Sequence, residues 1–298
     1  CSNFKNYIWA RKNNMGSSTL AGTKRRINSV RSTLKITSAM KVVATAKLKV
    51  YRDKMGKGSF YLDKMREVLA KVTCNMEDDD PDNINMFATG DKKLILVISS
   101  SLGLCGAYNT NINKLFHKNY KEGDEVLVVG HKIASHLDYE HILYDDQFIN
   151  AFQGFDYSVS RKIGKYLMEQ FKTKKYGSVL IIGTHYVNSI KFQPTAKVLF
   201  PIVADVKSTN PADIYAIIEP SPQKVYKELL PQYVNSLVNN IFLESAVSEY
   251  SSRRNAMENA SDNAEEIIDE LELQYNKARQ AQITQDITEV VSGANANK

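Results

Sequence analysis

The chain has 298 residues, 43% of them hydrophobic, and a formal net charge of +6. This apolar content excludes wholesale disorder, and no apolar stretch approaches the roughly 20 residues that a membrane span needs. The three cysteines, Cys1, Cys74 and Cys105, contain no CxxC pair. An odd set with this spacing excludes a disulfide framework and a cysteine-based metal site, and it favours a reducing compartment.

Residues 1–19 are expected to form an N-terminal extension. It places Phe4, Tyr7, Ile8 and Trp9 among basic residues, a pattern that fits either a short amphipathic contact segment or a frayed tail. Because Ser2 follows Cys1, a lipid-modified first residue is an open alternative.

The next segment, residues 20–75, predicts one long helix. Its apolar stripe runs through Ile27, Val30 and Leu34 and then, after an expected shift of register, through Ile36, Met40, Val43 and Leu48. A stripe this narrow suits a coiled-coil seam better than a globular core. The helix is also strongly basic, which suits nucleic acid, an anionic membrane or an acidic protein partner; its basic residues, against the single acid Asp53, are Lys24, Arg25, Arg26, Arg31, Lys35, Lys41, Lys47, Lys49, Arg52, Lys54 and Lys57.

Residues 91–210 predict an inserted Rossmann-like α/β domain. Nearly continuous apolar runs at 93–99, 125–130 and 178–184 alternate with helical patterns at 109–120, 132–138 and 158–174. Buried strands separated by helices indicate a mostly parallel sheet that is covered on both faces.

Residues 221–298 predict a second long helix. Ser221 can cap its start, and Pro231 is expected to end or kink its first turns. Beyond Pro231 about sixty residues without proline or an early glycine would span roughly 90 Å. We expect this helix to bury its apolar stripe by forming an antiparallel coiled coil with the N-terminal helix of the same chain. Since the C-terminal helix is longer, it should run alone past the end of its partner.

Few residues suggest catalysis. The turn from Gly103 to Asn109 (GLCGAYN) follows a strand, but it matches GxGxxG poorly, and no P-loop is present. The histidines His117, His131, His136, His141 and His185 are scattered, which favours structural roles over metal binding. We therefore expect no catalytic residue, no metal site and no cofactor in this chain. A Rossmann-type enzyme with a helical arm and a basic coiled-coil nucleic-acid binder remain as alternatives.

Several strings resemble the gamma subunit of F-type ATP synthase. They are RINSVRSTLKITSAMKVVATAKL at 26–48, GLCGAYN with Asn111, LLPQYVNSLVNNIFLESAVSE at 229–249, DNAEEIIDELELQYNKARQA at 262–281 and ITQDITEVVSG at 283–293. They occur in family order over nearly the whole chain beyond Leu20. The resemblance implies a central shaft that couples rotation to ATP synthesis or hydrolysis.

The resemblance also implies partners. In the family the terminal helices lie inside a ring of three alpha and three beta subunits, which bind ATP, ADP and Mg²⁺, and the α/β domain lies beside an epsilon-type subunit and a membrane rotor ring. Nucleic acid is not a family partner. By position, contacts with the alpha/beta ring fall on Lys35, Met40, Lys41, Arg253, Gln280, Thr284 and Gln285, and rotor-side or ring-mouth contacts fall on Cys105, Tyr108 and Asn109. An acidic loop of the beta subunit suits the basic helix.

Two departures from the family pattern bear on the load that the shaft carries. Ser101 and Leu102 stand where the family usually has Asp-Arg, and the extension before Met15 is additional. The alternative is a gamma-like shaft of an F1-like ATPase that drives a machine other than a proton rotor. The expected location is the cytoplasmic face of a bacterial plasma membrane, peripheral and held through partners unless Cys1 is lipidated, with the mitochondrial inner membrane as the alternative.

Overall fold

The computed structural model describes residues 20–76, 84–152, 156–202 and 217–296. The expected N-terminal extension, including Cys1, lies outside these residues. Two compact units can be distinguished, one formed by the chain up to Val42 together with the chain from Met257, the other by Val43–Ala256. Helices α2 (Leu20–Thr73) and α6 (Pro222–Ala296) each contribute to both units. Within the described ranges, no helix combines the length and apolar character that crossing a bilayer requires.

The first unit is an antiparallel pair of helices with a heptad seam. On α2 the side chains of Thr23, Ile27 and Thr37 are buried, and on α6 those of Met257, Ser261, Ala264, Ile268 and Leu271 are buried. The alternating spacing of three and four residues is that of a coiled coil. The pairing of Lys41 with Glu258 and of Arg31 with Glu272 shows that the helices run in opposite directions.

The expected shift of register in α2 is wrong. Ile36 and Val43 are 61% and 55% exposed, whereas Thr37 and Ala44 are buried. The seam therefore keeps its spacing through a polar and a small residue. Thr37 is tolerated there because its Oγ1 lies 2.8 Å from Ser261 Oγ, which satisfies both hydroxyl groups.

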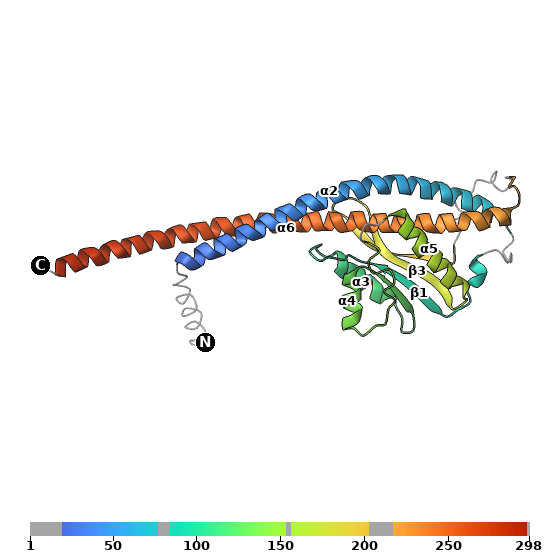
Figure 1. Cartoon of the computed structure of the whole chain (residues 1–298), viewed down its shortest axis with the longest axis horizontal. Helices are drawn as coiled ribbons and strands as arrows, with labels where there is room; N and C mark the ends of the chain where they lie inside the picture. Colours follow the sequence, from blue (N-terminus) through green and yellow to red (C-terminus); the bar gives the residue numbers. More distant parts are fainter. Residues whose placement is uncertain (1–19, 77–83, 153–155, 203–216, 297–298) are drawn as a thin grey trace, which may run out of the picture. The chain divides into compact units, whose positions relative to one another are not determined.

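The last part of α6 has no partner among the described residues. Every residue from 281 to 294 is exposed, and Figure 1 shows α6 continuing past the start of α2 within this unit. The longer C-terminal helix thus extends beyond its mate as a single helix.

The second unit is built on a four-stranded sheet of order β2-β1-β3-β4. The strands are β1 (Lys92–Ile98), β2 (Glu125–Val129), β3 (Tyr176–Tyr186) and β4 (Phe192–Phe200). The first three are parallel, while β4 pairs antiparallel with β3. Apolar runs predict the parallel strands, but β4 is half-exposed and contains Pro194, which is tolerated because β4 lies at an edge.

Both faces of the sheet are covered. Alternate strand residues such as Ile95 and Val97 pack with α3 (Tyr108–Asn119) and α4 (His131–Tyr139). Their neighbours Leu96 and Ile98 pack with α5 (Tyr157–Lys172) and α6. Figure 1 shows these two layers of helices, and a short 3₁₀ helix, η1 (Ile84–Phe87), precedes β1. The expected mixed α/β sheet domain with long terminal helices is confirmed.

Helix α6 continues through Pro231, where the sequence predicts an end or a kink. A proline inside a helix removes one hydrogen bond and costs about 3 kcal/mol. The flanking residues Leu230, Tyr233 and Val234 are buried in the core. Burying large apolar side chains contributes about 1.5–3 kcal/mol each, which is enough to keep the helix continuous.

Tyr226 gives a test of this packing. It is 3% exposed, and burial raises its pKa to about 12 from 10.0. A raised tyrosine pKa means that the folded state favours the protonated form. The contribution of Tyr226 to the free energy of unfolding is therefore complete below pH 10 and is lost as the pH rises towards 12. We expect Tyr226→Phe to remove this contribution to the loss, which is on the order of 1 kcal/mol by pH 11. Urea unfolding of both proteins between pH 9 and 11 measures the onset; parallel losses in both would contradict it.

Candidate partner-binding surfaces

The turn after β1 is fixed by hydrogen bonds to its own residues. Ser100 N donates to Asn109 Oδ1 at 3.2 Å, and Asn109 Nδ2 lies 3.1 Å from Cys105 Sγ. Gly106 has a φ of +56°, a left-handed conformation that favours glycine. The string GLCGAYN thus forms a tight connection from β1 into α3.

This turn docks on α6, at the carboxyl ends of the parallel strands. Ser252 Oγ donates to Cys105 O at 2.6 Å, and Tyr108 OH donates to Ser245 O at 3.3 Å. At the end of β3, Thr184 N donates to Ser245 Oγ at 3.1 Å. In open α/β sheets ligands bind at this end, beside the point where the strand order reverses. Here helix α6 of the same chain fills that position.

A buried ion pair locks the turn onto α6. Arg253 Nη1 lies 2.6 Å from Glu249 Oε1, and both side chains are under 10% exposed. Arg253 Nη2 also donates to the carbonyl oxygens of Leu102 and Gly103 at 3.1 and 3.4 Å. Burial raises the pKa of Glu249, while the charge of Arg253 lowers it. The structure therefore gives Arg253 an internal role; its direct contact with another subunit stays a prediction.

The predicted ring-mouth residues lie inside this docked turn. Cys105 and Tyr108 are 2% and 1% exposed, and Asn109 is half-buried. Burial raises the pKa of Cys105 and raises that of Tyr108 well above 10.0. A raised thiol pKa disfavours the thiolate, so Cys105 is unsuited to nucleophilic chemistry. The large apolar side chains that the turn exposes are instead those of Leu102 and Leu104, at 69% and 63%.

In the first unit, the predicted contacts on α6 all lie on the exposed end of the helix. Thr284 donates to Gln280 O, and Gln285 Nε2 donates to Glu289 Oε1 at 2.9 Å. The Gln285–Glu289 pair is of the four-residue spacing that stabilises a lone helix by about 0.2–0.5 kcal/mol. The same segment exposes an apolar stripe at Ile283, Ile287 and Val290, which are 49%, 59% and 72% exposed.

The predicted contacts on α2 differ in exposure. Lys35 is exposed, whereas Met40 is half-buried. Lys41 Nζ pairs with Glu258 Oε1 at 2.9 Å. Sequence reasoning missed that Ile36 and Val42 face outwards, at 61% and 67% exposure. Their signal was the heptad spacing of Thr37 and Ala44, which leaves Ile36 outside the seam.

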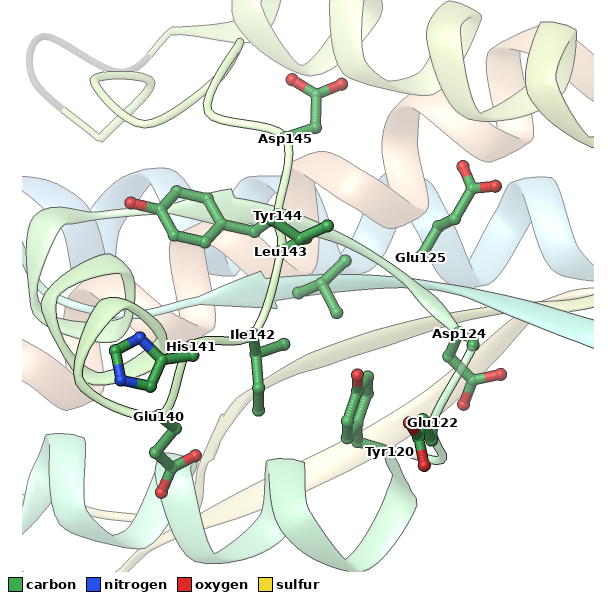
Figure 2. Close-up of a pocket in the computed structure, with 12 residues that line it drawn as sticks. Tyr120, Glu122, Asp124, Glu125, Glu140, His141, Ile142, Leu143, Tyr144 and Asp145 are labelled. Carbon is green, nitrogen blue, oxygen red and sulfur yellow. The ribbon is translucent and has the colours of Figure 1, made fainter.

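One open pocket of about 770 Å³ lies beside the edge strand β2, lined partly by carboxylates. Figure 2 shows these carboxylates around the rim and not converging on a centre. Several serve the fold: Asp124 Oδ1 accepts from Lys93 N, Glu125 Oε2 from Tyr176 OH and Asp145 Oδ2 from Tyr166 OH. Three of the carboxylates that line this pocket are therefore engaged in hydrogen bonds that hold the fold together.

Sequence comparison identifies relatives along nearly the entire chain. A family model described as ATP synthase matches residues 19–296. The ATP synthase gamma chain of Mycoplasma mycoides is 35% identical over 278 residues, which cover 93% of this chain and 98% of the relative. The gamma chain of Halothermothrix orenii is 35% identical over 285 residues, covering 94% and 99%.

Solved structures share the fold. The OSCP/F1/c-ring structure of Euglena gracilis mitochondrial ATP synthase contains a chain that matches with a TM-score of 0.68 and 17% identity, covering 93% of this chain and 94% of that one. A rotor structure from the same source gives a TM-score of 0.64 and 16% identity, covering 89% and 99%. The chain therefore belongs to the ATP synthase gamma chain family, the non-catalytic central rotor shaft of the F1 ATPase.

Proposed function

We propose that this chain turns inside a ring of three alpha and three beta subunits and transmits torque through the exposed end of α6 and the outer face of α2. The observation that carries the proposal is the single helix at 281–294, which has an apolar stripe and no partner among the described residues. Exposed apolar stripes indicate interaction surfaces. A ring of subunits around the helix would cover this apolar stripe at every angle of rotation.

The amide-rich surface of that helix suits a bearing. Gln282 Nε2 donates to Asp286 Oδ1 at 2.8 Å, and Gln285 pairs with Glu289 in the same way. Amide groups can exchange hydrogen bonds with successive neighbours without committing a net charge. Few strong ion pairs then need to break as the helix passes from one ring subunit to the next.

The outer face of α2 carries positive charge that would help to orient the chain within the ring. In the first unit Lys35 is exposed beside the apolar side chain of Ile36. Opposite charges across an interface guide encounter and fix orientation more than they add affinity. An acidic loop on the beta subunit is the partner that fits this basic face.

The chain itself carries no catalytic residue and no cofactor under this proposal. Two observations support this part of the proposal. Helix α6 docks at the carboxyl end of the sheet, where ligands bind in other α/β proteins, and the pKa of Cys105 is raised. ATP, ADP and Mg²⁺ would bind to the partner subunits. An epsilon-type subunit and a membrane rotor ring would hold the α/β domain, so that the chain is peripheral to the membrane through its partners.

Co-expression with the alpha and beta subunits of the same genome tests the assembly. We expect one copy of this chain for three alpha and three beta subunits, and no nucleotide bound by the isolated chain. Tight stoichiometric binding of nucleotide to the isolated chain would overturn the proposal. If the complex purified from the native cells contained the alpha/beta ring but lacked rotor-ring and stator proteins, the alternative would be favoured, a shaft that drives a different machine; exposed Leu102 and Leu104 at the docked turn are its candidate contacts.

The apolar stripe should be needed for assembly. We expect the triple substitution Ile283→Ser, Ile287→Ser and Val290→Ser to weaken binding to the alpha/beta ring by roughly tenfold or more, since partial burial of three such side chains contributes at least about 1.4 kcal/mol. The urea midpoint of the isolated chain should not change, because all three are exposed. Leu143→Ser, at a residue 92% exposed in the second unit, is the matched control. If the complexes of the parent chain, the triple variant and Leu143→Ser dissociated equally on dilution, the apolar stripe would not contribute to binding the ring.

A further inference from the structure

Three side chains of metal-binding type meet between α3 and α4. His117 lies near the end of α3, His136 lies in the last turn of α4, and Glu140 caps that helix. His117 Nε2 lies 3.1 Å from His136 Nε2, and each of these atoms lies 3.3 Å from Glu140 Oε1. Three potential ligand atoms thus form a nearly equilateral triangle.

The size of this triangle matches a tetrahedral zinc site. Zinc binds imidazole nitrogen at about 2.0–2.1 Å and carboxylate oxygen at about 2.0–2.2 Å. A tetrahedron with bonds of that length has edges of about 3.3–3.4 Å. An ion placed above the triangle would therefore reach all three atoms with small adjustments of the side chains, and its fourth position would face solvent.

The backbone holds these residues in place. Phe116, which precedes His117, and Leu137, which follows His136, are both fully buried in the core on this face of the sheet. The two imidazole rings meet edge to face, with centroids 5.4 Å apart. Rigid supports of this kind orient ligands before an ion arrives.

The site is both accessible and electrostatically suited to a cation. The side chains of His117, His136 and Glu140 are 42%, 29% and 29% exposed. Glu140 N bonds back to His136 O, so the carboxyl end of α4 ends at the cluster. The partial negative charge of a helix carboxyl end favours positive charge beside it.

We propose that His117, His136 and Glu140 bind one divalent transition-metal ion such as zinc, with water as its fourth ligand. Two imidazoles and one carboxylate suit zinc better than magnesium or calcium, which take oxygen ligands. The ion joins α3 to α4 and so stiffens the helical layer on that face of the sheet. This site is independent of the contacts with the ring.

Titration of the untagged full-length chain with zinc chloride and cobalt chloride tests the site. We expect one equivalent of zinc per chain and an intense visible cobalt spectrum, the signature of tetrahedral coordination. Loss of an outer-shell partner typically weakens metal binding by 10- to 100-fold. The ligand substitutions His117→Ala, His136→Ala and Glu140→Gln should each weaken zinc binding by roughly 100-fold.

His141→Asn is the matched control. His141 is an exposed histidine next to Glu140 with a φ of 58°, a conformation that asparagine tolerates. The His141→Asn variant should bind zinc like the parent chain and show the same rise in unfolding temperature when zinc is added. Glu140→Gln, in which glutamine is nearly isosteric with glutamate, should show no such rise. Zinc binding that survives in Glu140→Gln and His136→Ala, or the absence of a one-to-one complex, would overturn the proposal.

Discussion

Arg253→Ala is expected to destabilise the chain by about 3–5 kcal/mol. Removing one partner of a buried ion pair leaves the other charge without compensation, which is why the loss exceeds the value of the pair itself. Glu249 is 3% exposed, and its Oε2 has no hydrogen-bond partner in the described part of the chain. The substitution also removes the donor to the carbonyl oxygens of Leu102 and Gly103.

The loss should depend on pH in a defined direction. Burial already raises the pKa of Glu249 above its ordinary value of 4.5, and Arg253 opposes that rise. Without Arg253 the folded-state pKa of this carboxyl group rises further. Its contribution to stability is then greatest below pH 4.5 and falls as the pH rises through the folded-state pKa. The deficit of Arg253→Ala should therefore be smaller at pH 5 than at pH 8.

The double variant Arg253→Met, Glu249→Leu is the control for this prediction. Replacing a buried ion pair by apolar residues of similar size is often neutral or stabilising. We expect it to recover most of the stability and to lose the pH dependence. Urea unfolding of the three proteins at pH 5 and pH 8 gives the comparison. A loss below about 1 kcal/mol, or one equal at both pH values, would show that Arg253 does not lock the turn.

The ends of the chain and the parallel strands could be predicted because their signals are local. The absence of proline beyond Pro231 predicts a long helix, and apolar runs at 93–99, 125–130 and 178–184 predict buried strands. The seam register of α2 could not be read from apolar residues alone. Thr37 is acceptable in the seam because its hydroxyl donates to Leu34 O at 3.0 Å and pairs with Ser261 Oγ, far along the chain.

Two site assignments depended on tertiary contacts that sequence cannot show. Arg253 is a charged residue on a helix, a type that is usually exposed, yet Glu249 and the turn after β1 enclose it. His117 and His136 come together only because α3 and α4 pack side by side on one face of the sheet. Their separation along the chain hides any metal-site spacing.

Gly183→Ala is expected to destabilise the chain by about 2–3 kcal/mol, although alanine is the smallest possible change. A Cβ at Gly183 would lie 2.8 Å from Ile241 Cγ2 and 2.9 Å from Ser245 Oγ, both on α6. Neither atom can yield easily, because Ile241 is β-branched and Ser245 accepts a hydrogen bond from Thr184 N. Overpacking of this kind typically costs 1–3 kcal/mol.

Gly56→Ala is the matched control, because the same atom is added in open space. Apart from the backbone of α2 itself, nothing lies within 4 Å of a Cβ built at Gly56, which sits inside this helix. Alanine is favoured over glycine within a helix by about 0.5–1 kcal/mol, so this variant should gain stability. Urea midpoints should therefore move in opposite directions. If both variants gain stability, α6 does not lie as close to β3 as the packing at Gly183 requires, and the docking that excludes a ligand from the end of the sheet would fail with it.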